Sequence, residues 1–264
     1  MGRKIVVTSG KGGVGKTTIV ALFGLALSLK KQKVLLLDLD VSLNNLDVVL
    51  NIENKIIYDL ADVLQGKCGP KQAVIQSYDY DNLYVLPSAH FTSCTDLDLN
   101  RLPDIVNELA RDFDYVLIDC PAGVEKLFYV AIKCANEALV VVTPHVSSIR
   151  DADKIIGILR RKDMSNILMA VNRIRGDLVE SKKILSYKDI EDLTHVPCVA
   201  TIPEMDEINM SASLYFADYL NPKVFMPYRM LADSYIKDKT KLFDCGKKYR
   251  GPFGIIKRLI KAKI

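Results

Sequence analysis

The chain has 264 residues, 49% of them apolar and 26% charged, and this size and balance favour one sizeable α/β domain over two. The net charge is +4, but residues 245–264 carry seven Lys or Arg and no acid, so the remainder has a net charge of −3. A mildly acidic body argues against a nucleic-acid-binding surface that extends over the whole protein. The basic tail indicates one local anionic target.

No secretory signal precedes the first predicted strand, and the apolar run at residues 19–29 is too short to span a bilayer. We therefore expect the protein to stay in the cytoplasm. None of the six cysteines forms a C-x-x-C pair, so all are expected to be small buried thiols. They are Cys68, Cys94, Cys120, Cys134, Cys198 and Cys245.

Predicted strands and helices alternate along the chain. Apolar, β-branched runs predict strands at residues 4–8, 34–37, 83–86, 115–118, 138–143, 167–171 and 199–202. Apolar residues at helical spacing predict helices at residues 16–29, 99–111 and 147–161, and two more before and after Pro222. Buried strands that alternate with helices indicate an α/β fold, with a mostly parallel β-sheet and helices on both faces. Polar residues follow most of these strands, at the edge where such sheets bind ligands.

Residues 10–17 match the phosphate-loop pattern G-x-x-x-x-G-K-[ST], directly after a strand and before a helix. The glycines let backbone N–H groups turn toward an anion, and the helix directs its positive end there. Lys16 is expected to reach the β- and γ-phosphates of ATP, and the Thr17 hydroxyl is expected to bind Mg²⁺. The residues predicted to bind ATP in this loop are Lys11, Gly12, Gly13, Val14, Gly15, Lys16, Thr17 and Thr18.

Lys11 distinguishes this loop from an ordinary one, where a lysine at this position would simply be solvated. The string Lys-Gly-Gly-Val-Gly-Lys-Thr-Thr at residues 11–18 resembles the deviant Walker A ATPase family, which includes MinD, ParA and the nitrogenase iron protein. The resemblance implies a P-loop NTPase that forms a homodimer with ATP. It also implies that Lys11 is catalytic, because it would reach the partner's nucleotide and neutralise charge that develops in phosphoryl transfer.

Acidic residues end two of the predicted strands. Asp38 and Asp40 follow the second strand, and Asp119 follows the strand at residues 115–118. The resemblance implies that Asp40 is catalytic and orients the attacking water, while Asp38 and Asp119 serve the metal. It also implies a switch segment of Pro121, Ala122 and Gly123, after Asp119, that senses the γ-phosphate. The alternative for Asp40 is that it only caps a helix.

Asn172 and Arg173 follow one predicted strand, and Pro203 follows the next. The resemblance implies that these loops hold adenine, with the amide at the base edge and the proline against the ring. Without the resemblance, all three are ordinary turn residues.

Within the family, the chain resembles the MinD branch most. The matching stretches are residues 45–47, 118–125, 146–153 and 171–175. This implies a MinD-like ATPase that helps to place the division septum, recruits a MinC-like division inhibitor and responds to a MinE-like activator or another topological factor. Ser42, Asn44 and residues 211–222 depart from the MinD pattern, which affects the first switch and its partner contacts.

Residues 253–264 have the pattern of an amphipathic helix. Phe253, Ile256 and Ile260 fall on one face with Leu259 beside them, and Lys257 and Lys261 fall on the opposite arc. We divide the chain into an ATPase domain at 1–244 and a tail at 245–264, whose helix binds anionic lipid on the inner face of a bacterial membrane. One such helix binds weakly, but an ATP dimer presents two. The alternative is a terminal helix docked on the body.

Three other functions share parts of this pattern. A ParA-type DNA-partitioning ATPase would need basic patches on the body, which is net acidic. A reductase like the nitrogenase iron protein would need paired cysteines for an iron–sulfur cluster, and Cys94, Cys120 and Cys134 lack that surrounding pattern. A flagellar-placement relative of MinD usually carries an N-terminal extension, which is not expected here.

Overall fold

The computed structural model describes residues 2–39, 46, 52–88, 97–206 and 221–254. These residues form a sheet of eight strands in the order β3-β4-β2-β5-β1-β6-β7-β8. All neighbouring strands are parallel except β3 and β4. The strands are β1 Arg3–Thr8, β2 Val34–Asp38, β3 Ile75–Gln76, β4 Leu83–Leu86, β5 Tyr115–Asp119, β6 Glu137–Val142, β7 Asn166–Ile174 and β8 Cys198–Pro203.

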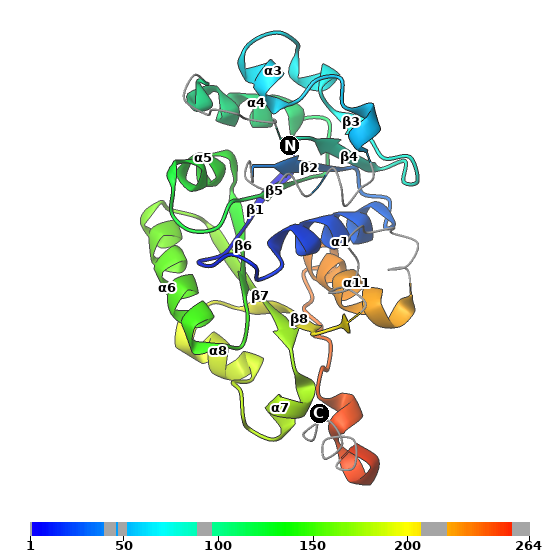
Figure 1. Cartoon of the computed structure of the whole chain (residues 1–264), viewed down its shortest axis with the longest axis vertical. Helices are drawn as coiled ribbons and strands as arrows, with labels where there is room; N and C mark the ends of the chain where they lie inside the picture. Colours follow the sequence, from blue (N-terminus) through cyan, green and yellow to red (C-terminus); the bar gives the residue numbers. More distant parts are fainter. Residues whose placement is uncertain (1, 40–45, 47–51, 89–96, 207–220, 255–264) are drawn as a thin grey trace.

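Helices cover both faces of this sheet (Figure 1). The α-helices are α1 Lys16–Ser28, α3 Leu60–Leu64, α4 Leu102–Leu109, α5 Lys126–Cys134, α6 Val146–Arg161, α7 Gly176–Glu180, α8 Tyr187–Thr194 and α11 Pro222–Lys237. Short 3₁₀ turns are η1 Glu53–Lys55, η2 Pro70–Gln72, η4 Leu99–Arg101 and η5 Lys247–Tyr249. In Figure 1, α5, α6 and α8 lie to the left of the sheet, and α1 and α11 lie to the right. This arrangement confirms the predicted fold class.

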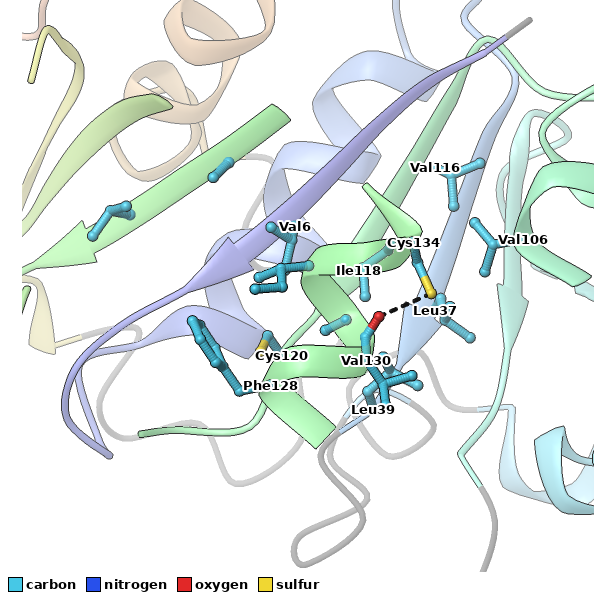
Figure 2. Close-up of a cluster of buried hydrophobic side chains, with 14 of the residues drawn as sticks. Val6, Leu37, Leu39, Val106, Val116, Ile118, Cys120, Phe128, Val130 and Cys134 are labelled. Atoms are coloured by element: carbon cyan, nitrogen blue, oxygen red, sulfur yellow. Dashed lines mark hydrogen bonds between the residues drawn. The ribbon is translucent and has the colours of Figure 1, made fainter. Parts of the chain in front are cut away.

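The two faces of the sheet bury separate apolar clusters, because successive side chains of a strand point to opposite faces. Leu117 of β5 packs in the cluster that includes α1 and α11. Ile118 packs in the cluster on the other face, with Val6 of β1 and Phe128 of α5. Figure 2 shows this second cluster, where the Cys134 thiol of α5 donates to the Val130 carbonyl at 3.2 Å. Burial of each large apolar side chain contributes about 1.5–3 kcal/mol, so these clusters hold the central strands in place.

The predicted strands are all present, and most of their ends agree within one or two residues. The predicted helix at 99–111 is a 3₁₀ turn followed by α4, and the helix after Pro222 is α11. The helix predicted before Pro222 falls largely on residues 207–220, outside the described residues. The sequence prediction missed α3, α5, α7, α8 and the two-residue edge strand β3. None of the described helices is long and apolar enough to cross a bilayer.

The first part of the predicted tail packs on the body, beside α7. The Arg250 guanidinium donates to Glu180 Oε1 at 2.8 Å and to Asp244 Oδ2 at 2.7 Å. Tyr249, the residue before Arg250, is buried. We call residues 244–250, held on α7 in this way, the clasp. Residues 251–254 follow it as one helical turn, in which Phe253 is 81% exposed.

Candidate nucleotide site

The phosphate loop joins β1 to α1 at the carboxyl edge of the sheet. Gly15 has φ 93° and sits in the left-handed region as the N-cap of α1. No side chain caps this helix, and no acid stands in its first turn. Its first N–H groups are therefore open to an anion, as the helix N-terminus of a phosphate site requires.

Asn172 of β7 holds this loop from the side. Its Nδ2 donates to the Val14 carbonyl at 2.8 Å, and the bond is buried. A Cβ on Gly15 would lie 2.5 Å from the same nitrogen. The site therefore needs glycine at position 15 for two reasons, since the backbone is left-handed and the amide occupies the space of a side chain.

The two lysines of the loop lie in different surroundings. Lys16 is only 6% exposed, whereas Lys11, Gly12 and Gly13 are exposed. A buried ammonium group is costly unless an anion compensates it, so the position of Lys16 suits a bound phosphate. Lys11 is accessible from outside the molecule.

Two buried carboxylates lie side by side at this edge. Asp38 ends β2 and Asp119 ends β5, and the two residues are paired in the register of these neighbouring strands. Asp38 is 2% exposed and Asp119 is fully buried. The backbone N–H of Leu46 donates to Asp38 Oδ2 at 3.4 Å. The structure thus brings together the two acids predicted to serve the metal.

The donor set fits Mg²⁺ more than a metal held by protein alone. Within the described residues, no group of three His, Cys, Asp or Glu could hold an ion. Mg²⁺ usually keeps waters and phosphate oxygens and takes only one or two carboxylates from the protein. Asp38, Asp119 and the half-buried Thr17 on the first turn of α1 supply that smaller set.

The predicted second switch rests on the phosphate loop. The N–H of Gly123 donates to the carbonyl of Ser9 at 3.4 Å. The Ala122 methyl lies 3.9 Å from where a Cβ on Gly12 would stand. Ala122 and Gly123 therefore lie against the phosphate loop, and the switch role of residues 121–123 stays a prediction. Asp40, predicted for the first switch, lies outside the described residues.

The predicted adenine contacts are arranged differently from a pair of turns. Asn172 and Arg173 lie inside β7, which runs on to Ile174, and Pro203 is the last residue of β8. Arg173 has φ 54°, an irregularity at which the register between β7 and β8 shifts. The strand prediction ended too early because a polar pair interrupts the apolar run.

A hollow of about 320 Å³ opens beside the phosphate loop. Its walls include residues 11–14 of the loop, residues 143–145 after β6, and Arg173, Arg175 and Glu204. Asn172 and Pro203 are not among its lining residues, so only Arg173 of the predicted adenine contacts reaches it. Sequence reasoning missed Arg175 and Glu204, although both directly follow strands that point to the site.

Known proteins are similar in sequence to most of this chain. The family model described as "AAA domain" matches residues 2–171. The septum site-determining protein MinD of Synechocystis is 42% identical over 213 residues, which cover 81% of this chain and 80% of that protein. The chain belongs to the MinD family. Within this family, the buried Lys16 is the phosphate-binding lysine and the paired acids are the metal-site carboxylates, and the chain is an ATPase.

Two solved structures of this family resemble the fold closely. The MinC:MinD cell division protein complex of Aquifex aeolicus aligns with a TM-score of 0.83 and 36% identity, covering 91% of this chain and 98% of that chain. The septum site-determining protein MinD of Pyrococcus horikoshii, solved with Mg-ADP, aligns with a TM-score of 0.81 and 30% identity, covering 90% and 97%. These likenesses confirm the fold and the family predicted from the loop.

Proposed function

We propose that this MinD-family ATPase is a membrane-recruited switch that places the cell-division septum. It dimerises with ATP, binds the inner face of the bacterial membrane through residues 253–264, and recruits a MinC-like division inhibitor. The observation that carries this proposal is the different placement of the two loop lysines. Lys16 is buried in its own site, and Lys11 is exposed, as a residue that serves a second molecule must be.

ATP is the substrate and Mg²⁺ its cofactor. The relative from Pyrococcus horikoshii binds Mg-ADP, and the residues of this chain suit the same group. When bound, Mg²⁺ would supply positive charge against the negative charge that develops on the phosphates. Asp38, Asp119 and Thr17 would hold it, Lys16 neutralises the phosphates, and the uncapped first turn of α1 binds them.

Dimerisation is supported by the surface around the loop. Val124 follows the second switch and is 48% exposed, and Val146 begins α6 beside the hollow and is 61% exposed. Exposed apolar side chains near a functional site are typical of an interface. A partner bound there would bring its own Lys11 near the nucleotide, which supports a role in which each copy completes the other's site.

Membrane binding is supported by the composition of the tail and by Phe253. The phenyl ring lies exposed on the last described turn, and four Lys or Arg follow within ten residues. A basic amphipathic segment binds where anionic headgroups meet apolar chains. The proposal of a MinC-like partner is supported by the Aquifex aeolicus relative, which was solved as a MinC:MinD complex. The activator could be MinE-like or another topological factor.

The lysine roles are tested by two matched substitutions. Lys11→Ala should leave ATP binding within a few-fold of the wild type and abolish hydrolysis, whereas Lys16→Ala should abolish nucleotide binding. Fluorescent ATP titration and phosphate release measure the two properties. If Lys11→Ala still turns over ATP at the wild-type rate, the role of Lys11 across the dimer is wrong.

The role of Asp40 is tested by Asp40→Ala, which should trap an ATP dimer. A variant that stays monomeric with ATP and Mg²⁺ would contradict the role given to Asp40.

The cellular role is tested by sedimentation with anionic liposomes in ATP and in ADP, with duplex DNA as competitor. We expect ATP-dependent pelleting that DNA does not prevent, and loss of pelleting when residues 253–264 are removed. A truncated protein that still pellets would refute the anchor. Displacement by DNA would favour the ParA-type alternative.

A further inference from the structure

Ser9 contacts two functional segments, although no sequence motif gives this residue a role. It follows β1 directly and is completely buried. Its hydroxyl donates to the carbonyl of Lys11 at 2.7 Å. Its own carbonyl accepts from the N–H of Gly123 at 3.4 Å. One side chain and one backbone group of the same residue therefore contact the exposed lysine and the second switch.

The bond to Lys11 fixes more than one atom. The carbonyl of Lys11 lies in a planar peptide unit, so holding the oxygen also fixes the orientation of the bond to Gly12. The neighbouring positions are held as well. A Cβ on Gly10 would lie 2.3 Å from the backbone of Asp151 in α6, and Asn172 holds the carbonyl of Val14. The backbone of Lys11 is thus held in place while its side chain extends outward.

A long, exposed lysine side chain has many conformers, and each one it must give up to reach a phosphate costs free energy. A fixed backbone removes part of that cost, since the side chain then starts from one position and one direction. In a mobile loop the same lysine would spend most of its time out of reach of the partner's nucleotide.

We propose that Ser9 is a positioning residue that fixes the backbone of Lys11 for its role in hydrolysis and connects it to the second switch. This inference rests on the proposed role of Lys11 across the dimer. It predicts that loss of the Ser9 hydroxyl slows hydrolysis and leaves nucleotide binding largely intact, because Lys16, the first turn of α1 and the Asn172–Val14 bond all remain.

The test is Ser9→Ala, with Ser234→Ala as the matched control. Ser234 is also buried, and its hydroxyl donates to the Met230 carbonyl at 3.0 Å in α11. We expect Ser9→Ala to lower kcat about tenfold and to change the Kd for ADP less than threefold, the size of effect that one net hydrogen bond can produce. Ser234→Ala should match the wild type in both. Wild-type kcat in Ser9→Ala would overturn the proposal, and so would a loss of ADP affinity as large as the loss of kcat.

A double-substitution cycle shows whether Ser9 acts through Lys11. Long single-turnover incubations measure the slow reaction that remains once Lys11→Ala has abolished steady-state hydrolysis. Ser9→Ala added to Lys11→Ala should not slow this remaining reaction further, because the lysine that Ser9 positions is gone. A further tenfold loss would show a separate structural role and overturn the proposal. Ser9→Thr, which keeps the hydroxyl, should restore most of kcat if it folds. Turnover of Lys11→Ala alone reports on the proposed function, so the two ideas can fail separately.

Discussion

Gly15→Ala tests the contact between the phosphate loop and β7. A left-handed conformation costs an alanine about 1–2 kcal/mol. The new methyl would also lie 2.5 Å from Asn172 Nδ2, so the amide must move and lose its bond to Val14. A lost hydrogen bond that leaves a buried group unpaired costs about 1–3 kcal/mol. We therefore expect Gly15→Ala to lower the free energy of unfolding by about 3 kcal/mol and to abolish nucleotide binding.

Two other glycines separate these contributions. Gly66 has φ 74° and Gly13 has φ 73°, and a Cβ on either would meet nothing within 4 Å. Gly66→Ala should therefore show only the backbone cost of about 1–2 kcal/mol and leave nucleotide binding intact. Gly13→Ala should show the same backbone cost, but at a position inside the phosphate loop. Because the chain has no Trp, denaturant unfolding is followed by circular dichroism, and binding by a fluorescent ADP analogue. If Gly15→Ala is no worse than Gly66→Ala in both assays, the role assigned to Asn172 is wrong.

Three further outcomes follow from the structure. Asp119→Asn should keep the fold and reduce Mg²⁺-dependent phosphate release by at least about 10–100-fold, the range for losing a group that supports a metal site. Unchanged Mg²⁺ dependence would remove Asp119 from the metal site. Glu180→Ala should speed hydrogen exchange in residues 244–250, whereas Glu180→Gln, which keeps an acceptor for Arg250, should do so less; equal exchange in all three proteins would show that Glu180 does not hold the clasp. Burial raises the pKa of three thiols to about 12, so these thiols stay protonated at pH 8. They should react with iodoacetamide only after unfolding, which mass spectrometry measures. Rapid labelling of the native protein would contradict this expectation. These thiols are Cys134 and Cys198, which are buried, and Cys245, which is half-buried. The prediction that all six thiols are buried is wrong for Cys68 and Cys245, which are both half-buried.

Local patterns were enough to predict the sheet and its large helices. The buried strands are continuous apolar runs, and α6 has apolar residues at regular helical spacing, so the order of elements could be read directly. The missed elements carry weaker signals. β3 has only two residues, and the N-cap residue of α5, Glu125, makes no capping hydrogen bond with its side chain. For α8 a signal was present, since Ser186 and Asp189 form a capping box that begins the helix.

The residues of the nucleotide site also divide into those that a local pattern predicts and those that only the folded chain brings together. The phosphate loop is a continuous segment, so its residues could be predicted one by one. The pairing of Asp38 with Asp119 depends on β2 lying beside β5, and no local pattern gives that strand order. The bond from Asn172 to Val14 joins residues 158 positions apart, so only the folded chain reveals it. Asp40 and the membrane residues Ile256, Lys257, Leu259, Ile260 and Lys261 stay predictions, because they lie outside the described residues.

The clasp determines how a mechanical load on the end of the chain enters the protein. A pull on the chain after residue 250 is resisted first by the two ion pairs of Arg250 and by buried Tyr249, before it can reach α11. Glu180 transmits that force to α7, a helix of only five residues. Leu178 of the same helix and Arg175 just before it line the hollow beside the phosphate loop. Tension on the tail would therefore act first on the wall of the nucleotide site and only afterwards on the core of the fold.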